Sequence, residues 1–459
     1  MKSYLKKTLL FLSLMLCFTG CGNQSSVSDL PNTEKDETDS TTAPETRKDA
    51  LYFVDENNSP LYTVVYPEES IEVIGGAAEM LRAAIADATK AIVKREKDSK
   101  TVSTPYEILI GKTSRTDAAL VESLGLRDYR ILAQGDRIVI VGGSDFATAR
   151  AAQEFIKLFD ADTPYVAKDL SIEGTVTDVY RVAATNSGVA TIDIYEIFPF
   201  SNEETKLIRS YPVKVGSTGI NFRIDRNGRE VIVAGSGTHA CVLDYETGDL
   251  IWETYAAASG THGAELLPNG IVATASSSAS KVRLFDMDTR PNKYTEIDFP
   301  DAHGVQWDPT QEVLWVIGSN KLQAYRVEKN DDGIVATAEP TMGLRIPSAS
   351  GHDISPVYGE PDMLWFTTSK GVYQFNKKTR QFNSVSSTVM ATESVKGIGS
   401  YSDGSIVTSF PDKKPTSLYT WTTEKINFYF NLDGTLYPFF YETPGVHHYK
   451  CRVVNTSYQ

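Results

Sequence analysis

The spacing of apolar residues changes character roughly a third of the way along the chain. Between residues 51 and 175, strand-like runs such as PLYTVVYP (60–67) alternate with stretches in which apolar residues recur at helical spacing. Helices are expected over 70–92 and over DFATARAAQEFIKLF (145–159), with Ser144 or Asp145 as the N-cap. This order predicts a small α/β sandwich domain over 51–175 and an α+β multidomain fold class.

From about residue 176 the helical period disappears and short strands are separated by turns every few residues. Five stretches resemble one another, and their third positions are separated by 44, 41, 49 and 44 residues. These positions are Thr218, His262, His303, His352 and Lys396. A repeat of this length is typical of four-stranded propeller blades.

The two ends of this region complement each other. GVHHYKCRVVN (445–455) matches the first strand of a repeat, whereas YRVAATNS (180–187) matches the second strand. A sixth blade built from both ends would remove the free sheet edges of an open array. The sequence therefore predicts a six-bladed β-propeller over 176–459.

Several segments resemble known families. YEILIGKTSR (106–115) and the hairpin and helix that follow resemble the α/β accessory domain that precedes the catalytic barrel in hexosaminidases and α-glucuronidases. VLDYETGDLIWE (242–253) resembles the blades of pyrroloquinoline-type propellers, and the repeats resemble WD repeats in part. As a whole the chain is similar to uncharacterised bacterial surface lipoproteins of this two-domain type. These resemblances imply a carbohydrate context and carry over no catalytic residue.

The first 20 residues have the pattern of an export signal, with three lysines before the apolar run TLLFLSLMLCF. The small residues before Cys21 resemble the lipobox of bacterial lipoproteins, which implies cleavage before Cys21 and lipid attachment to its thiol. Residues 21–50 are polar and predict a disordered linker. We expect a lipid-anchored protein of the bacterial cell membrane that faces outside the cytoplasm. Cys241 and Cys451 either form one bridge or remain as two buried thiols.

The charge balance excludes one class of partner. The chain carries a formal net charge of −14. Nucleic-acid binding needs clustered lysine and arginine, and no such run follows the first few residues.

Histidines occupy a recurring place in the repeats. In a propeller the first strands line the central channel, so the third positions should circle one channel mouth. His447 occupies this position in the sixth repeat, while His239 and His448 should lie on the same face. All six histidines of the chain are thus predicted to gather there.

Three interpretations of this mouth remain open. In the first, His262, His303, His352 and His447 bind a divalent transition metal, zinc or manganese, with Asp353 as a further oxygen donor. Propeller-based oligogalacturonate lyases are similar in plan. In the second, Lys396, His352 and His448 act as acid–base catalysts of β-elimination on a uronic-acid polymer, without metal. In the third, the histidines only plug the channel.

These interpretations give two classes of function. One is an extracellular carbohydrate-active enzyme of lyase type, and the other is a non-catalytic surface propeller that binds glycan or protein. For either class the expected ligand-binding residues belong to the mouth: Thr218, His239, His262, His303, His447 and Asp353.

The aromatic residues are interpreted mainly as structure. The five tryptophans, Trp421 among them, fall at strand positions in different repeats and predict inter-blade core. The aromatic run 426–442 predicts an extended hairpin turning at Asp433–Gly434, which either packs on the N-terminal region or forms an exposed patch for sugars.

Overall fold

The computed structural model describes residues 47–214, 216, 218–289, 293–413 and 419–459. The predicted signal peptide, Cys21 and most of the predicted linker lie outside these residues. In the part of the chain that is described, no helix combines the length and apolarity needed to cross a bilayer.

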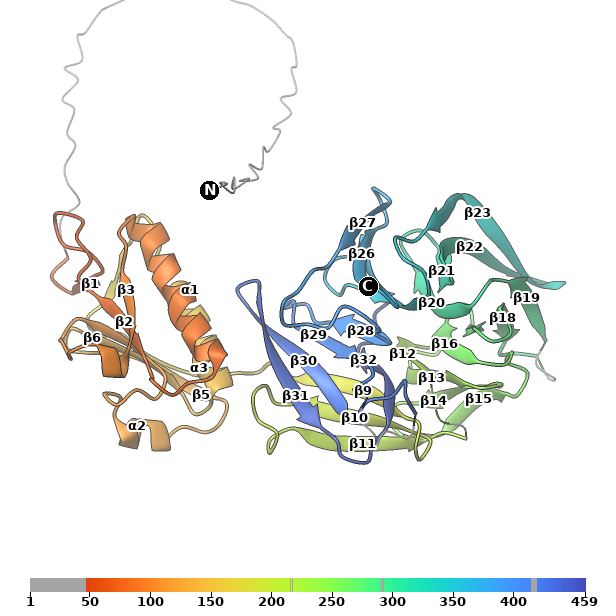
Figure 1. The fold of residues 1–459 in the computed structure, drawn as a ribbon, viewed down its shortest axis with the longest axis horizontal. Coiled ribbons are helices and arrows are strands. Elements are labelled where there is room, and N and C mark those ends of the chain that lie inside the picture. Colours follow the sequence, from red (N-terminus) through yellow and green to blue (C-terminus); the bar gives the residue numbers. More distant parts are fainter. Residues whose placement is uncertain (1–46, 215, 217, 290–292, 414–418) are drawn as a thin grey trace, which may run out of the picture. The chain divides into compact units, whose positions relative to one another are not determined.

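Six four-stranded antiparallel sheets make up the C-terminal region, which confirms the six-bladed β-propeller. Figure 1 shows these sheets following one another from yellow-green to blue along the chain. The first sheet contains β12 (Gly219–Ile224), β13 (Glu230–Ser236), β14 (His239–Asp244) and β15 (Leu250–Thr254), and the second contains β16 (Thr261–Leu266), β17 (Ile271–Ser276), β18 (Lys281–Asp286) and β19 (Tyr294–Asp298). The third contains β20 (Ala302–Asp308), β21 (Val313–Gly318), β22 (Lys321–Asn330) and β23 (Gly333–Arg345), and the fourth contains β24 (Gly351–Pro356), β25 (Met363–Thr368), β26 (Val372–Asn376) and β27 (Gln381–Ser384). The fifth contains β28 (Gly397–Ser400), β29 (Ile406–Ser409), β30 (Lys425–Leu432) and β31 (Thr435–Glu442).

The sixth sheet closes the ring as the sequence predicted. Its strand order is β11 (Lys206–Pro212), β10 (Thr191–Ile197), β9 (Tyr180–Asn186) and β32 (His448–Val453). The innermost strand β32 therefore comes from the end of the chain and pairs antiparallel with β9. The closing blade thus joins the two ends of the propeller region, so that the ring of six blades is complete.

A mixed sheet precedes the propeller, in the order β3-β2-β4-β6-β5-β8. Its strands are β2 (Thr63–Tyr66), β3 (Lys94–Lys97), β4 (Glu107–Ile110), β5 (Asp128–Gln134), β6 (Arg137–Gly142) and β8 (Ser171–Thr175), and β1 (Ala50–Tyr52) pairs separately with β7 (Tyr165–Ala167). The helices are α1 (Glu72–Thr89), α2 (Ala118–Glu122) and α3 (Asp145–Ile156), with a 3₁₀ turn at Asp98–Lys100. Ser144 caps α3 by accepting a hydrogen bond from the backbone N–H of Ala147, as expected.

The expected α+β multidomain fold class, with a separate small α/β sandwich, is wrong. The described chain is almost entirely β, with 32 strands and only three α-helices, and residues 49–459 form one compact unit. The helical periods were read correctly, but their residues do not close a core of their own. Phe146 of α3 packs edge-on against Phe430 of β30 at 5.5 Å between ring centroids, within one continuous buried cluster.

Two polar contacts strengthen this shared core. Arg150 of α3 donates to the Asp403 carboxylate at 2.7 Å, and Tyr180 donates to the same oxygen at 2.7 Å. The aromatic run forms β30 and β31, which turn at Asp433–Gly434 as predicted, and its packing against the N-terminal region is the interpretation that holds.

Glycine inside α1 allows this close packing. A Cβ on Gly76 would lie 1.8 Å from the hydroxyl oxygen of Tyr437 in β31. Glycine weakens a helix interior by about 1 kcal/mol, so its presence here is explained by the approach of the tyrosine.

Cysteines and tryptophans complete the core. Cys241 and Cys451 are both free and buried, so no bridge joins them. Four tryptophans are buried between strands as predicted: Trp252, Trp307, Trp315 and Trp365. The prediction is wrong for Trp421, which is 46% exposed because it lies in the loop between β29 and β30 and not on a strand.

Candidate functional site at the channel mouth

Three histidines occupy the same irregular position at the start of neighbouring inner strands. In β16, β20 and β24 the pairing with the next strand skips one residue, and the skipped residue is His262, His303 or His352. A β-bulge of this kind turns the extra side chain away from the regular alternation of the strand. The bulges therefore aim three imidazoles from three blades at one place.

Small residues beside the histidines let the inner strands converge. A Cβ on Gly263 would lie 3.0 Å from the carbonyl oxygen of His303, and a Cβ on Gly219 would lie 2.8 Å from that of His262. Glycine is needed where backbones come this close.

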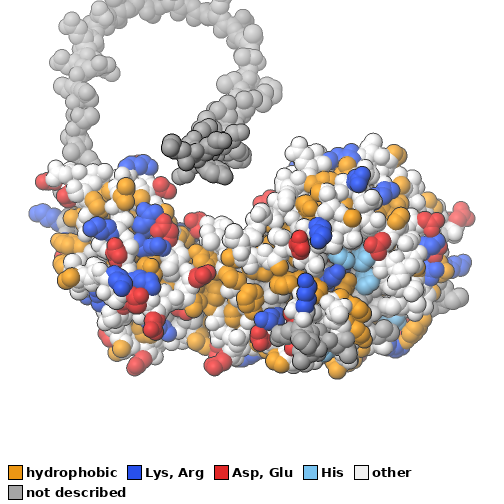
Figure 2. All heavy atoms as spheres, in the orientation of Figure 1, with side chains coloured by type: hydrophobic (Ala, Val, Ile, Leu, Met, Phe, Trp, Pro, Cys, Tyr) orange, Lys and Arg blue, Asp and Glu red, His pale blue; other side chains and the backbone are white. Residues whose placement is uncertain are grey.

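The three rings and one amine form a continuous row, which we call the mouth cluster: His262, His303, His352 and Lys396. The rings of His262 and His303 stack with centroids 4.8 Å apart, and those of His303 and His352 meet edge-on at 5.0 Å. The Nζ atom of Lys396 lies 3.0 Å from Nε2 of His352. Figure 2 shows histidine atoms reaching the surface of the propeller, with charged side chains around them.

The environment of the cluster keeps the imidazoles of His262 and His352 neutral. Burial, together with the neighbouring charges of His303 and Lys450, lowers the pKa of His262 to about 3. Burial, together with the Lys396 amine, lowers the pKa of His352 to about 3. Burial also lowers the pKa of Lys396 from its ordinary value, although the carboxylate of Asp301 acts in the opposite direction.

Lys396 lacks the partner that a partly buried lysine usually has. Among the described residues, no carboxylate lies within 4.0 Å of its amine, and its side chain bonds only to the imidazole of His352. A protonated amine only donates, so Nε2 of His352 accepts and the ring proton sits on Nδ1. This buried Nδ1 has no hydrogen-bond partner, and neither has Nδ1 of His262.

A charged network fills the channel just beneath the cluster. The Asp353 carboxylate, fully buried, accepts from Nζ of Lys450 at 3.0 Å and from both terminal nitrogens of Arg452. Burial alone would raise the pKa of Asp353, but Arg452 and Lys450 hold it below its usual range. Both oxygens of Asp353 are thus already committed to cations.

The opposite end of the channel is closed by the last residues of the chain. The carbonyl of Ser457 accepts from Arg223 at 3.2 Å, and the ring of Tyr458 lies beneath the same guanidinium at 4.4 Å. Gln306 donates to the carbonyl of Tyr458 at 3.4 Å. A ligand would therefore approach the axis from the histidine side.

The other predicted site residues lie outside the mouth cluster. Thr218 uses its hydroxyl to bond the carbonyls of Gly235 and Thr261. His239 pairs with Glu253 at 3.2 Å in its own blade. The ring of His447 lies near Gly188, where an added Cβ would be 3.1 Å from its Cδ2.

His448, expected to be catalytic, is completely buried in the closing blade. Its Nε2 lies 3.0 Å from the hydroxyl of Thr443, and its Nδ1 lies 3.3 Å from the carbonyl of Thr185. Burial lowers the pKa of His448 to about 4. The ring also packs edge-on against Tyr195 of β10 at 5.8 Å between ring centroids, so its neighbours belong to the closing blade and not to the mouth cluster.

The donor set of the mouth does not fit the predicted zinc or manganese ion. In the described part of the chain, no group of three or more histidine, cysteine or acidic side chains is arranged to hold a metal. Nδ1 of His303 is already bonded to the carbonyl of Asp301 at 2.9 Å, and Lys396 already occupies Nε2 of His352. The ammonium group also repels a cation.

Several buried polar residues of the channel were not among the predicted site residues. Lys450, Arg452 and Asn221 are buried and face the axis. Their signal was available, because Lys450 and Arg452 alternate with apolar residues in an inner strand whose positions are all buried. Regular alternation of charged residues in a buried strand indicates a polar interior.

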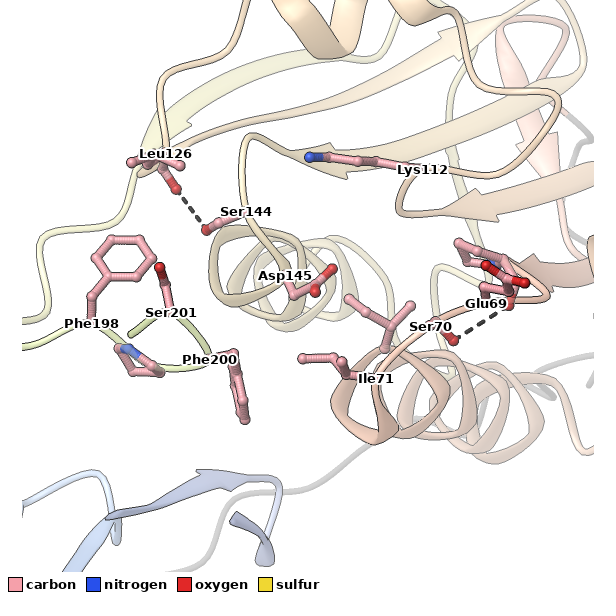
Figure 3. A pocket seen from close by; sticks show the side chains of 13 residues that line it. Glu69, Ser70, Ile71, Lys112, Leu126, Ser144, Asp145, Phe198, Phe200 and Ser201 are labelled. Atoms are coloured by element: carbon pink, nitrogen blue, oxygen red, sulfur yellow. Dashed lines mark hydrogen bonds between the residues drawn. The ribbon is translucent and has the colours of Figure 1, made fainter. Parts of the chain in front are cut away.

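A separate pocket of about 480 Å³ lies beside the N-terminal ends of α1 and α3 (Figure 3). Asp145 points into it, and burial raises the pKa of this carboxyl. Lys112 donates to the carbonyl of Gly143 at 3.2 Å, and Ser144 to that of Leu126 at 2.6 Å. The pocket shares no lining residue with the mouth cluster.

No curated protein matches the chain. Solved structures similar to it include a functionally unknown protein from Desulfotomaculum acetoxidans DSM 771, at 12% identity and a TM-score of 0.39, covering 69% of this chain and 96% of that one. The WD40 β-propeller domain of Doa1 has 9% identity and a TM-score of 0.38, with coverage of 60% and 83%. The β-propeller domain of Myceliophteria thermophila Cps50 (Swd1) has 13% identity and a TM-score of 0.38, with coverage of 57% and 86%.

The sequence model of a family of unknown function matches residues 145–436, which is more than half of the chain. The matched range runs from α3 through four complete blades to the start of β31 and contains the whole mouth cluster. The chain belongs to this family, DUF6528.

Proposed function

We propose that the propeller binds an acidic carbohydrate at its channel mouth, with a carboxylate of the ligand facing Lys396. The observation that carries this proposal is the partly buried Lys396 amine, which has a neutral imidazole and no carboxylate as its partner. Removing a charge from water is costly unless a counter-charge is supplied. A ligand carboxylate would supply it.

Unsatisfied donors support a polar ligand. Nδ1 of His352 is a buried donor with no acceptor, and the hydroxyl of Ser187 on the same face is also without a partner. Buried polar groups of this kind are normally bonded to protein, water or ligand. Sugar hydroxyls both donate and accept, so they can satisfy imidazole nitrogens in either tautomer.

The acidity of the whole chain limits which ligands can be bound. With a net charge of −14, the protein repels polyanions at long range. The attraction must therefore be local to Lys396 and the Lys450–Asp353–Arg452 network. Their three cations outnumber the carboxylates of Asp353 and nearby Asp301 by one when both lysines are protonated. A short oligosaccharide with isolated carboxylates fits this pattern better than a long polyanion.

The location fits such a ligand if the predicted export signal and lipid attachment at Cys21 are correct. A lipid-anchored propeller outside the cytoplasm would meet glycans directly. Membrane fractionation after replacing Cys21 by alanine tests this part of the proposal. The protein should then leave the membrane, and an unchanged membrane fraction would refute the anchor.

Calorimetric titration with galacturonate and glucuronate oligomers tests the binding proposal. The Lys396→Met variant should lose at least about tenfold in affinity. Loss of the ion pair between the ligand carboxylate and the Lys396 amine is expected to cost about 1.4 kcal/mol, which corresponds to a factor of ten. Lys378→Met is the matched control, since this lysine is 73% exposed and pairs with Asp362 at the surface. Equal affinity of the Lys396→Met variant and wild type would refute the proposal. So would binding of the corresponding neutral oligosaccharides, without carboxylates, as tightly as the uronates.

A second function rests on one specific observation, the lowered pKa of Lys396 in contact with His352. In its neutral form such an amine can take the C5 proton next to a uronate carboxylate. A C4=C5 double bond then forms as the C4–O glycosidic bond breaks, and the protonated amine returns the proton to the leaving oxygen. The same titration samples, followed by ultraviolet absorbance of an unsaturated uronate, distinguish the two. Turnover that disappears in Lys396→Met makes the protein a lyase, and binding without product makes it a binding propeller.

A further inference from the structure

One tryptophan differs from the other four in its surroundings. Trp252, Trp307, Trp315 and Trp365 are between 1% and 9% exposed, whereas Trp421 is 46% exposed. Its ring stacks on that of Tyr419, itself 38% exposed, with centroids 4.7 Å apart and planes inclined by 11°. The two side chains thus form a flat, parallel aromatic pair at the surface, which we call the rim pair.

The rim pair is held by buried neighbours. Thr422 is fully buried and donates from its hydroxyl to the carbonyl of Tyr419 at 2.8 Å. Thr423 is also buried and pairs with the backbone of His448 in both directions, at 2.9 and 2.8 Å. These hydrogen bonds fix the backbone on both sides of Trp421. The two rings therefore stay at the surface, although burying them would be favourable.

Both ends of the segment that carries the rim pair lie at the channel mouth. At its start, the carbonyl of Ser409 accepts from the backbone N–H of Lys396 at 2.7 Å. At its end, Thr423 is bonded to His448, the residue that begins the inner strand of the next blade. The rim pair therefore belongs to the same face of the propeller as the mouth cluster.

We propose that the rim pair is a stacking platform for a second sugar ring of the ligand whose carboxylate faces Lys396. This inference rests on the proposed function and extends it from a single acidic residue to an oligosaccharide. The axial C–H groups of a pyranose pack on an aromatic face, while its hydroxyls stay in water at the edge. Exposed aromatic surface beside a polar site is typical of such recognition.

The platform predicts dependence on ligand length. A monomeric uronate held at Lys396 offers no second ring to the rim pair, whereas a trimer does. Wild-type protein should bind the trimer more tightly than the monomer. Aromatic stacking contributes about 0.5–1.5 kcal/mol, so Trp421→Ala should reduce trimer affinity about two- to thirteenfold and leave monomer affinity unchanged.

Calorimetric titration of galacturonate monomer and trimer into wild type, Trp421→Ala, Trp421→Phe and Lys396→Met tests the platform. Trp421→Phe keeps an aromatic face and should retain most of the trimer affinity. An unchanged trimer affinity in Trp421→Ala overturns the platform. If Lys396→Met still weakens both ligands, the proposed function survives that result. If Lys396→Met has no effect on either ligand, the proposed function fails.

Fluorescence gives an independent readout. Because the other four tryptophans are buried, quenching by acrylamide should come mainly from Trp421. The trimer should protect wild type from this quenching, while the monomer should not. Protection that is equal for both ligands, or that persists in Trp421→Phe, would place the second ring elsewhere and overturn the inference.

Discussion

Mild acid should destabilise the folded protein, because the folded structure keeps three histidines neutral. The pKa values of His262 and His352 are lowered to about 3 and that of His448 to about 4, mainly by burial. In the unfolded chain each of them titrates near its ordinary pKa of about 6.5. Below that pH the unfolded state binds protons that the folded state does not, so stability falls as pH decreases.

The magnitude follows from the distance between the two pKa values. At pH 5 each histidine is about 1.5 pH units below its unfolded pKa and still above its folded pKa. At 1.36 kcal/mol per unit, each contributes a loss of about 2 kcal/mol relative to pH 7.5. The three together give about 6 kcal/mol, a large part of the stability of an ordinary domain.

Urea unfolding followed by circular dichroism at pH 7.5, 6.5, 5.5 and 5.0 measures this loss. The range stays above the unfolded carboxyl pKa values of about 4, so acidic residues contribute little. His352→Gln removes one titrating ring and should reduce the loss between pH 7.5 and 5.0 by about 2 kcal/mol. Lys370→Met, at a position whose side chain is 68% exposed, should keep the wild-type slope.

Two results would refute this reasoning. A free energy of unfolding that is flat from pH 7.5 to 5.0 would show that the buried histidines gain protons without cost. A slope identical in wild type and His352→Gln would show that other groups cause the pH dependence.

Three further changes test the packing around the site. Gly76→Ala should destabilise the protein by about 1–3 kcal/mol, since the added Cβ would meet the hydroxyl of Tyr437. Adding Tyr437→Ala should recover part of that loss, as measured by chemical denaturation of the double variant. If the two losses of stability simply added, the contact would be contradicted. Arg452→Met should cost about 3–5 kcal/mol because it leaves the buried Asp353 with less compensation, and a melting temperature equal to wild type would be the opposing result. Deleting residues 455–459 should lower the melting temperature, measured by calorimetry, because Arg223 loses a carbonyl and a ring partner; unaltered melting would mean that this closure adds no stability.

Much of the propeller could be predicted because its information is repeated. Positions 218, 262, 303, 352 and 396 recur at blade spacing, and each copy supports the others. The N-terminal region has no repeat, and its helical periods do not reveal where the apolar faces pack. Phe146 and Phe430 are 284 residues apart in sequence, so their contact could not be read from local pattern.

The site was predicted in part, for the same reason. His262, His303 and His352 share a place in the repeat, and the structure brings them together with Lys396. The bulges that aim the rings depend on pairing between strands and leave no mark on the spacing. His448 shows the limit, because strand alternation would put it on the same side as Lys450 and Arg452. The pairing of β32 with β9 is irregular between His448 and Cys451, and local pattern does not reveal this.

The pairing of β32 with β9 has a consequence for how the protein is made. His448 pairs with Asn186, so the contact that joins the ring spans 262 residues of chain. During synthesis β9 can pair with β10 at once, but its inner edge must wait for β32 until nearly everything between them has left the ribosome. Such distant pairing slows folding and leaves a strand edge open to other chains meanwhile. Closure of the propeller by pairing of β32 with β9 is therefore expected to be a late step of folding, before which the new chain is prone to aggregate.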